Sequence, residues 1–127
     1  MNAYFEQMIL SASPVELVRL MYDQSILSVR DAREHLCRKR VAERSKAIMK
    51  AYSLVSELVT SLNQEHAPAL AANLRNLYFY VQGLLLKANC DQIDEPLAEA
   101  QALLGTLLEA WKQVPDVRPE TAAALAA

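Results

Sequence analysis

The sequence has few of the residues that make tight turns. It contains 2 glycines and 5 prolines in 127 residues, too few for the many turns of a β-sandwich or barrel. Leucine and alanine, which both favour helices, are abundant instead. The composition therefore predicts an all-α protein, and the length corresponds to one domain rather than two.

The sequence also lacks an excess of either charge. Thirteen basic residues stand against 15 acidic ones, for a formal net charge of −2. Because affinity for phosphates needs a concentrated positive surface, we expect no nucleic-acid partner. The one basic run in the sequence, Arg38–Arg40 with Arg44 beyond it, falls where a helix is expected to end, and positive charge is favourable there.

Long apolar runs are missing as well. No stretch approaches the ~20 residues needed to span a bilayer, and the first residues lack the basic start and apolar run of a signal peptide. We therefore expect a cytoplasmic protein without membrane insertion. Cysteine is scarce too, and the isolated Cys37 and Cys90 are expected to be reduced thiols.

Prolines and apolar periodicity divide the chain into four expected helices, at about 13–40, 42–62, 69–88 and 95–114. Ser13 is expected to cap the first, with Pro14 in its first turn, and Asp94 or Glu95 to cap the last. The expected core stripes are Val18, Tyr22, Ser25, Val29, Ala32 and Leu36; Ile48, Met49, Tyr52, Val55, Val59 and Leu62; Leu70, Leu74, Leu77, Val81, Leu84 and Ala88; and Leu97, Ala100, Leu104, Leu107, Trp111 and Val114.

Four amphipathic helices joined by short connections are typical of an antiparallel up-down four-helix bundle. We expect the bundle over residues 13–114, an N-terminal apolar leader over 1–12 packed across it, and a flexible C-terminal tail over 115–127. A dimeric core built from two long helices is the weaker alternative. The leader is either fixed core or a removable cover for a groove, because it carries apolar side chains that need burial: Tyr4, Phe5, Met8, Ile9 and Leu10.

No catalytic pattern is present in the sequence, so we expect no enzyme, cofactor or metal. There is no glycine-rich phosphate loop, and neither His35 nor His66 follows a glutamate by three residues, as di-iron bundles require. Histidine phosphotransfer modules are also four-helix bundles, which makes a signalling role for His35 an alternative function. The segment Glu34–Lys39 lacks the glycine that opens space beside such a histidine, so we interpret His35 as a surface residue near a helix C-terminus.

The third expected helix is apolar on too many sides. Ala72, Phe79, Gly83, Leu86 and Cys90 form a second stripe nearly opposite the core stripe, because residues 79 and 81 point about 200° apart. A helix that is apolar all round is covered by something else. The partner-binding surface is predicted to comprise Ala72, Asn76, Phe79, Tyr80, Gly83 and Leu86. A structural homo-oligomer, with another copy covering this surface, is a further alternative.

Three segments, in this order, resemble a known family. They are Leu10-Ser11-Ala12-Ser13-Pro14 leading into Leu17–Asp23, then Asn73–Tyr80 followed by Leu84–Asn89, and finally Glu109–Lys112. On these segments the chain resembles the flagellin-specific secretion chaperones, the FliS family, from about Tyr4 to Gln113. The resemblance implies a non-enzymatic bundle that binds the C-terminal segment of flagellin, prevents premature polymerisation and delivers the subunit to the flagellar type III export gate.

The resemblance also implies how the flagellin client is held. Client helices lie in apolar grooves, and the N-terminal leader occupies such a groove when the client is absent. We therefore expect flagellin as the partner of a monomer or weak dimer. Gln24 replaces a usual glycine, Phe79 replaces a residue that is more often polar, and Gln82-Gly83 replaces a commonly basic pair. These departures indicate a divergent flagellin or a paralogue with another client.

Overall fold

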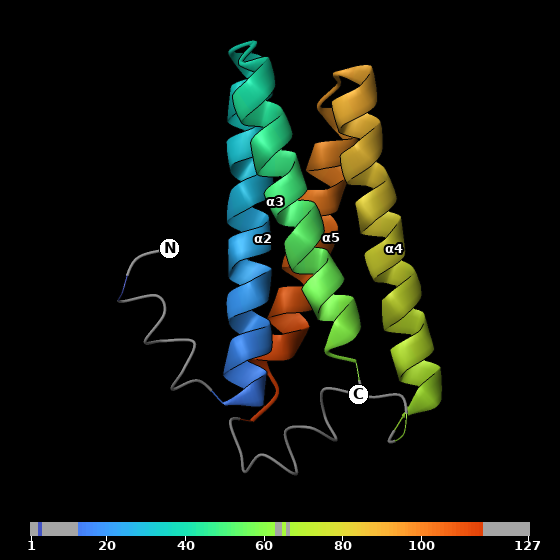
Figure 1. Cartoon of the computed structure of the whole chain (residues 1–127). Coiled ribbons are helices and arrows are strands. Elements are labelled where there is room, and N and C mark those ends of the chain that lie inside the picture. Colours follow the sequence, from blue (N-terminus) through green and yellow to red (C-terminus); the bar gives the residue numbers. More distant parts are fainter. Residues whose placement is uncertain (1–2, 4–12, 63–64, 66, 116–127) are drawn as a thin grey trace.

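The computed structural model describes residues 3, 13–62, 65 and 67–115. These residues form the helices α2 (Pro14–Cys37), α3 (Val41–Thr60), α4 (Pro68–Asp91) and α5 (Glu95–Lys112), and no strand. Each helix packs against the next, and α5 returns to α2, so the four run alternately up and down around a common core (Figure 1). The predicted all-α antiparallel bundle is confirmed.

The expected leader and tail fall almost wholly outside the part of the chain that is described. Of residues 1–12 only Ala3 is included, and of 115–127 only Pro115. The domain boundaries and the five apolar leader residues therefore stay predictions.

Local sequence sets the two ends of α2. The Ser13 hydroxyl oxygen accepts a hydrogen bond from the backbone N–H of Glu16 at 3.2 Å, which confirms the predicted cap. The helix ends at Cys37 rather than near Arg40, because Lys39 takes a left-handed backbone conformation with φ of 59°. A residue in that conformation cannot continue a right-handed helix.

The buried face of α4 is wider than predicted, and it consists of Ala71, Leu74, Tyr78, Val81, Gln82, Leu84, Leu85 and Ala88. Tyr78 and Leu85 were not expected there, whereas Leu70, which was, is exposed. Leu77 is only partly buried. Leu70, Leu77 and Leu84, which are spaced by seven residues, lie along the margin of the buried face. Ala71, Tyr78 and Leu85 lie along its centre.

The predicted stripes of α3 and α5 also differ in detail from the buried faces, because Tyr52, Val59, Leu62 and Val114 pack against the core but are only partly buried. In α3, Met49 is exposed, because it lies about 100° around the helix from the buried Ile48. In α5, Leu108 is buried while the predicted Leu107 is only partly buried. The predicted stripe of α2 is buried, apart from its partly buried last member, Leu36.

Three aromatic side chains join the helices through the middle of the core. The hydroxyls of Tyr22 in α2 and Tyr78 in α4 share a hydrogen bond of 2.7 Å, and Trp111 Nε1 in α5 donates to the Tyr22 hydroxyl at 3.2 Å. Burial raises the pKa of both tyrosines, so their hydroxyls stay protonated and available for these bonds. The Tyr22–Tyr78 bond fixes α4 against the helix diagonally across the bundle.

Buried polar side chains hold α4 against α3. Arg44, expected among surface basic residues, is only 5% exposed, and its Nε donates to Asn89 Oδ1 at 3.1 Å. Asn89 lies in the last turn of α4, so the cation also faces the negative end of that helix dipole. Nearer the middle of α4, Gln82 Nε2 donates to the Tyr52 carbonyl at 3.1 Å and to Ser56 Oγ at 2.8 Å. These bonds fix which side of α4 faces α3.

Candidate partner-binding surface

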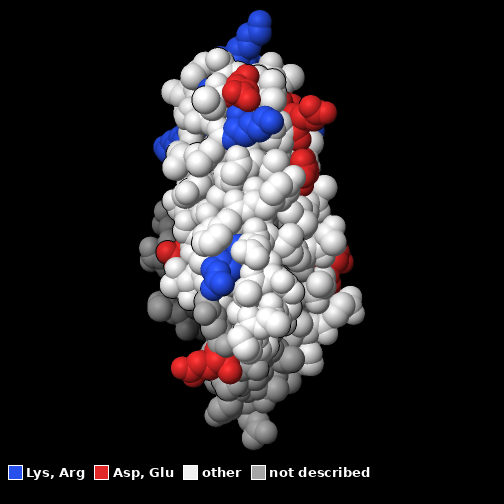
Figure 2. All heavy atoms as spheres, turned by 90° about the vertical axis from the view of Figure 1, so that its right-hand side faces the viewer, with Lys and Arg blue, Asp and Glu red and all other residues white. Residues whose placement is uncertain are grey.

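The outer face of α4 presents large apolar side chains to solvent. Phe79 is 51% exposed, Tyr80 50% and Leu86 45%. The side of the molecule formed by α4 carries few charged side chains (Figure 2). Within the 24 residues of α4 the charged ones are Arg75, Lys87 and Asp91. An apolar helix face of this kind is typical of a surface that a partner covers.

All members of the predicted surface lie on α4, but they occupy two flanks of it. The exposed members are Asn76, Phe79, Tyr80, Gly83 and Leu86, while Ala72 is half-buried. The hydrogen bonds between α4 and its neighbours show which flank of α4 borders α3 and which borders α5. The surface therefore covers two flanks of α4, one bordering α3 and one bordering α5.

Leu86 lies on the flank that borders α3. It follows Gln82 by four residues and precedes Asn89 by three, and both of these side chains bond to α3. Met49 stands in the same relation to α3, because it follows Ser45, which donates to Asn89, by four residues and precedes Tyr52, whose carbonyl accepts from Gln82, by three. The exposed Met49 and Leu86 therefore lie on the flanks of α3 and α4 that border each other. Met49 was missing from the predicted surface, because its place in the apolar pattern of α3 indicated a core residue.

Tyr80 lies on the flank that borders α5. The Tyr80 hydroxyl donates to the Glu99 carboxylate, and this hydrogen bond raises the pKa of Tyr80. A groove of about 570 Å³ separates the two helices here, lined by Tyr80, Gly83, Leu84, Lys87, Ile93, Glu95, Pro96 and Glu99. The groove floor is apolar and its rim is charged.

Gly83 lies between the two flanks, and the packing of the bundle does not explain it. A Cβ atom built on Gly83 meets no heavy atom of the described residues within 4 Å, and the same holds for Gly105 in α5. Glycine in a helix interior costs roughly 0.5–1 kcal/mol relative to alanine. The bare backbone at Gly83 leaves room for another helix to approach α4 closely.

Sequence comparison identifies the kind of protein that carries this surface. The family model described as Flagellar protein FliS matches residues 1–118. The chain belongs to the FliS family. The resemblance seen in the three sequence segments is therefore confirmed, and the apolar face of α4 is a feature of a FliS-family bundle.

Curated relatives of this FliS-family chain are flagellar secretion chaperones. It is 33% identical to the flagellar secretion chaperone FliS of Salmonella typhimurium over 110 residues, 86% of this chain and 82% of the relative. It is 29% identical to FliSB of Pseudomonas aeruginosa over 106 residues, 84% of each chain. The FliS of Bacillus subtilis is 26% identical over 112 residues, 88% of this chain and 83% of the relative. FliS is thus a family of chaperones rather than of enzymes.

His35 is less accessible in this FliS-family chain than expected. The side chain is half-buried between α2 and α3, and its Nδ1 is buried without a hydrogen bond in the described residues. It borders a cavity of about 220 Å³ that is also lined by Ser28, Asp31, Glu43, Lys46, Ala47 and Lys50. A phosphotransfer histidine must face its donor, so this placement does not favour the signalling alternative.

Other candidate features of the sequence are accounted for as follows. Cys37 and Cys90 are free thiols, as expected, and both are exposed. His66 lies outside the described residues. Over residues 13–62 and 67–115 no group of three or more His, Cys, Asp or Glu side chains is placed to hold a metal ion. None of the four described helices is long and apolar enough to cross a membrane.

Proposed function

We propose that this FliS-family chain is a cytoplasmic export chaperone for flagellin. It binds the C-terminal helical segment of flagellin, prevents premature polymerisation, and delivers the subunit to the flagellar type III export apparatus. The observation that carries the proposal is the outer face of α4, where Phe79, Tyr80 and Leu86 are about half exposed. The names of its curated relatives support a secretion chaperone.

The chemistry of the surface suits a helical client. An amphipathic helix lays its apolar face on a complementary apolar surface, and the burial supplies the driving force. The predicted client contacts are Ala72, Asn76, Phe79, Tyr80, Gly83 and Leu86, to which we add Met49 of α3. While these contacts hold, the apolar face of the client segment is unavailable for polymerisation.

Co-purification with flagellin from the same organism tests the proposal. We expect full-length flagellin to be retained by the tagged chain and a flagellin lacking its C-terminal segment to be lost. A stable homo-oligomer in sedimentation analysis that ignores added flagellin would instead support the oligomer alternative. Phosphorylation of His35 by a phospho-donor, without flagellin binding, would support the signalling alternative.

The proposal includes the leader as a cover of the client surface. Tyr4, Phe5, Met8, Ile9 and Leu10 form an apolar set on a segment too short for a stable isolated helix. Deleting residues 1–10 should raise the affinity for flagellin. If the leader leaves the client surface uncovered in a fraction f of the molecules, the affinity rises by a factor of 1/f. The deletion should also increase the ANS fluorescence of the free protein. Calorimetric titration measures the first effect. Unchanged ANS fluorescence together with a large loss of stability would show that the leader is fixed core.

Gly83→Ala should separate client binding from stability. The added methyl meets no described atom within 4 Å, so we expect stability to rise by about 0.4–1 kcal/mol. Against a closely approaching client the same methyl overpacks the contact by about 1–3 kcal/mol, which weakens flagellin binding about 5- to 150-fold. Gly105→Ala is the matched control, because Gly105 follows Gln101 by one turn on the side of α5 that faces α2. Equal flagellin affinity of the two variants would contradict a close approach at Gly83.

A further inference from the structure

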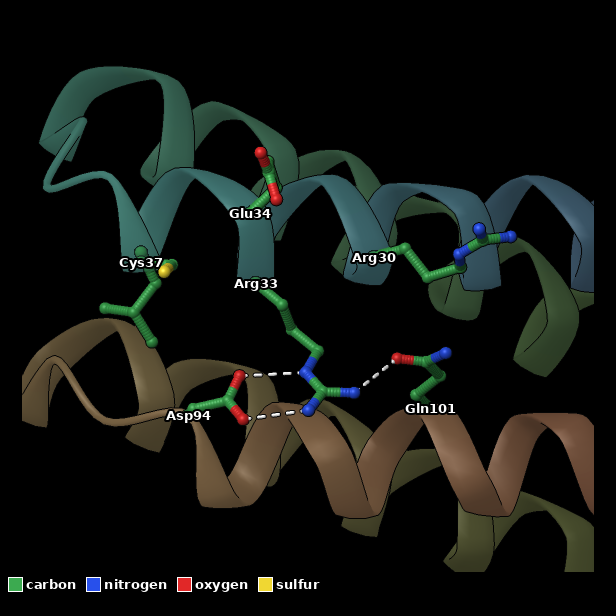
Figure 3. Close-up of a pocket in the computed structure, with 7 residues that line it drawn as sticks. Arg30, Arg33, Glu34, Cys37, Asp94 and Gln101 are labelled. Carbon is green, nitrogen blue, oxygen red and sulfur yellow. Dashed lines mark hydrogen bonds and ion pairs between the residues drawn. The ribbon is translucent and has the colours of Figure 1, made fainter.

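A second groove lies between α2 and α5, away from the outer face of α4. It has a volume of about 580 Å³ and is lined by Arg30, Arg33, Glu34, Leu36, Cys37, Asp94 and Gln101 (Figure 3). Around the bundle the order is α2, α3, α4, α5, so α4 is diagonally opposite α2. A molecule bound in the α2–α5 groove therefore leaves the outer face of α4 free.

Arg33 bridges the two walls of this groove, from α2 to α5 (Figure 3). Its Nε and Nη2 donate to the two carboxylate oxygens of Asp94 at 2.8 and 2.9 Å, and its Nη1 donates to Gln101 Oε1 at 2.8 Å. Asp94, expected as the cap of α5, makes no side-chain cap bond and serves this pair instead. Because the Gln101 oxygen is engaged by Arg33, its amide nitrogen is left as a donor, on the side of the groove where Arg30 lies (Figure 3).

Arg30 has no partner within the described residues. The two carboxylates that line the groove are engaged by other cations: Asp94 by Arg33, and Glu34 by Arg38 at 2.6 Å. Arg30 is exposed and makes no ion pair or hydrogen bond to any described residue. The Arg30 guanidinium and the Gln101 amide therefore offer donors to the groove, while each of its two carboxylates is already paired with an arginine.

We propose that the α2–α5 groove binds a carboxylate-bearing helical segment of a second protein, whose carboxylate is held by Arg30 and Gln101. A single carboxylate matches the groove better than a phosphate dianion, because Glu34 and Asp94 are each paired with an arginine and Arg30 is left as one uncompensated cation. Arg30 then gains the charge-assisted hydrogen bonds that the fold leaves unmade.

The shape of the groove favours a helix as the carrier of that carboxylate. The α5 residues that line the groove run from Asp94 to Gln101, about 10 Å at 1.5 Å per residue, which is two turns of a docked helix. Beyond the lining, Gly105 continues the Gln101 side of α5 by one turn, and a Cβ there meets no described atom within 4 Å. Leu36 adds an apolar contact on the α2 side.

The test uses three synthetic amphipathic peptides of about five helical turns, with leucine on one face and glutamate, glutamine or lysine beside it. Wild-type protein should bind the glutamate peptide about tenfold more tightly than the glutamine peptide, as measured by fluorescence anisotropy. Arg30→Glu should abolish that preference and favour the lysine peptide. Lys50→Glu, which makes the same charge change on α3, should keep the wild-type preference. In NMR spectra the Gln101 side-chain amide should shift on addition of the glutamate peptide.

Three outcomes would overturn the proposal. Equal affinity of wild-type protein for the glutamate and glutamine peptides would show that no carboxylate is recognised. An equal loss in Lys50→Glu would show a general electrostatic effect. Flagellin binding should be unchanged in Arg30→Glu, and weakened flagellin binding would assign the groove to the client rather than to a second protein. Because flagellin and peptide are assayed separately, failure of the peptide test leaves the chaperone proposal intact.

Discussion

Leu85→Asp should destabilise the bundle by about 4 kcal/mol or more, enough to unfold much of the protein. Leu85 is fully buried at the centre of the core face of α4. An aspartate there removes the packing of a leucine and buries an unpaired charge. Leu86→Asp makes the same chemical change one residue later, where the side chain is about half exposed. Its stability should stay within about 0.5 kcal/mol of wild type.

Urea denaturation followed by circular dichroism measures both variants. We expect a much lower midpoint for Leu85→Asp, if a folded baseline remains, and a wild-type midpoint and slope for Leu86→Asp. Similar midpoints for the two variants would show that the buried and outer faces of α4 are wrongly assigned. Leu84→Asp, at the edge of the buried face, should be intermediate between them.

The helices could be predicted from the sequence because their signals are local. Ser13 with Glu16 caps α2 within four residues of chain, and the prolines mark helix starts. The core face of α4 is harder to assign. Its residues are apolar on nearly all sides, so periodicity alone does not separate the central Tyr78 and Leu85 from the marginal Leu70. Hydrophobicity alone would place the row of leucines that begins at Leu70 at the centre of the core face, although the row through Tyr78 is the one that packs there.

Features that depend on helix pairing could not be predicted at all. The buried Arg44 donates a hydrogen bond to Asn89, 45 positions later in the sequence, and Arg33 forms an ion pair with Asp94, 61 positions later. Nothing in the local sequence distinguishes these arginines from surface ones. The exposure of Met49 could not be predicted for the same reason, because it depends on where α4 packs against α3. The apolar excess of α4, in contrast, is contained in one segment of sequence, and for that reason its exposed outer face could be predicted.

Phe79→Asp should lower flagellin affinity about 100-fold while leaving the urea midpoint unchanged. Full burial of a phenylalanine side chain is worth about 1.5–3 kcal/mol, and an aspartate adds the cost of desolvating a charge against an apolar client. Together these amount to about 3 kcal/mol, or roughly two orders of magnitude in the dissociation constant. Phe79 is 51% exposed and takes no part in the core, so folding does not depend on it.

Leu27→Asp is the matched control for this change. Leu27 is 46% exposed on α2, diagonally across the bundle from α4, so the substitution alters charge and apolar area in the same way at a distant place. We expect calorimetric titration to give wild-type flagellin affinity for Leu27→Asp. An equal loss in both variants would mean that the client is not confined to α4. Loss in Leu27→Asp alone would move the client surface to α2, because an apolar contact acts only where the partner removes it from water.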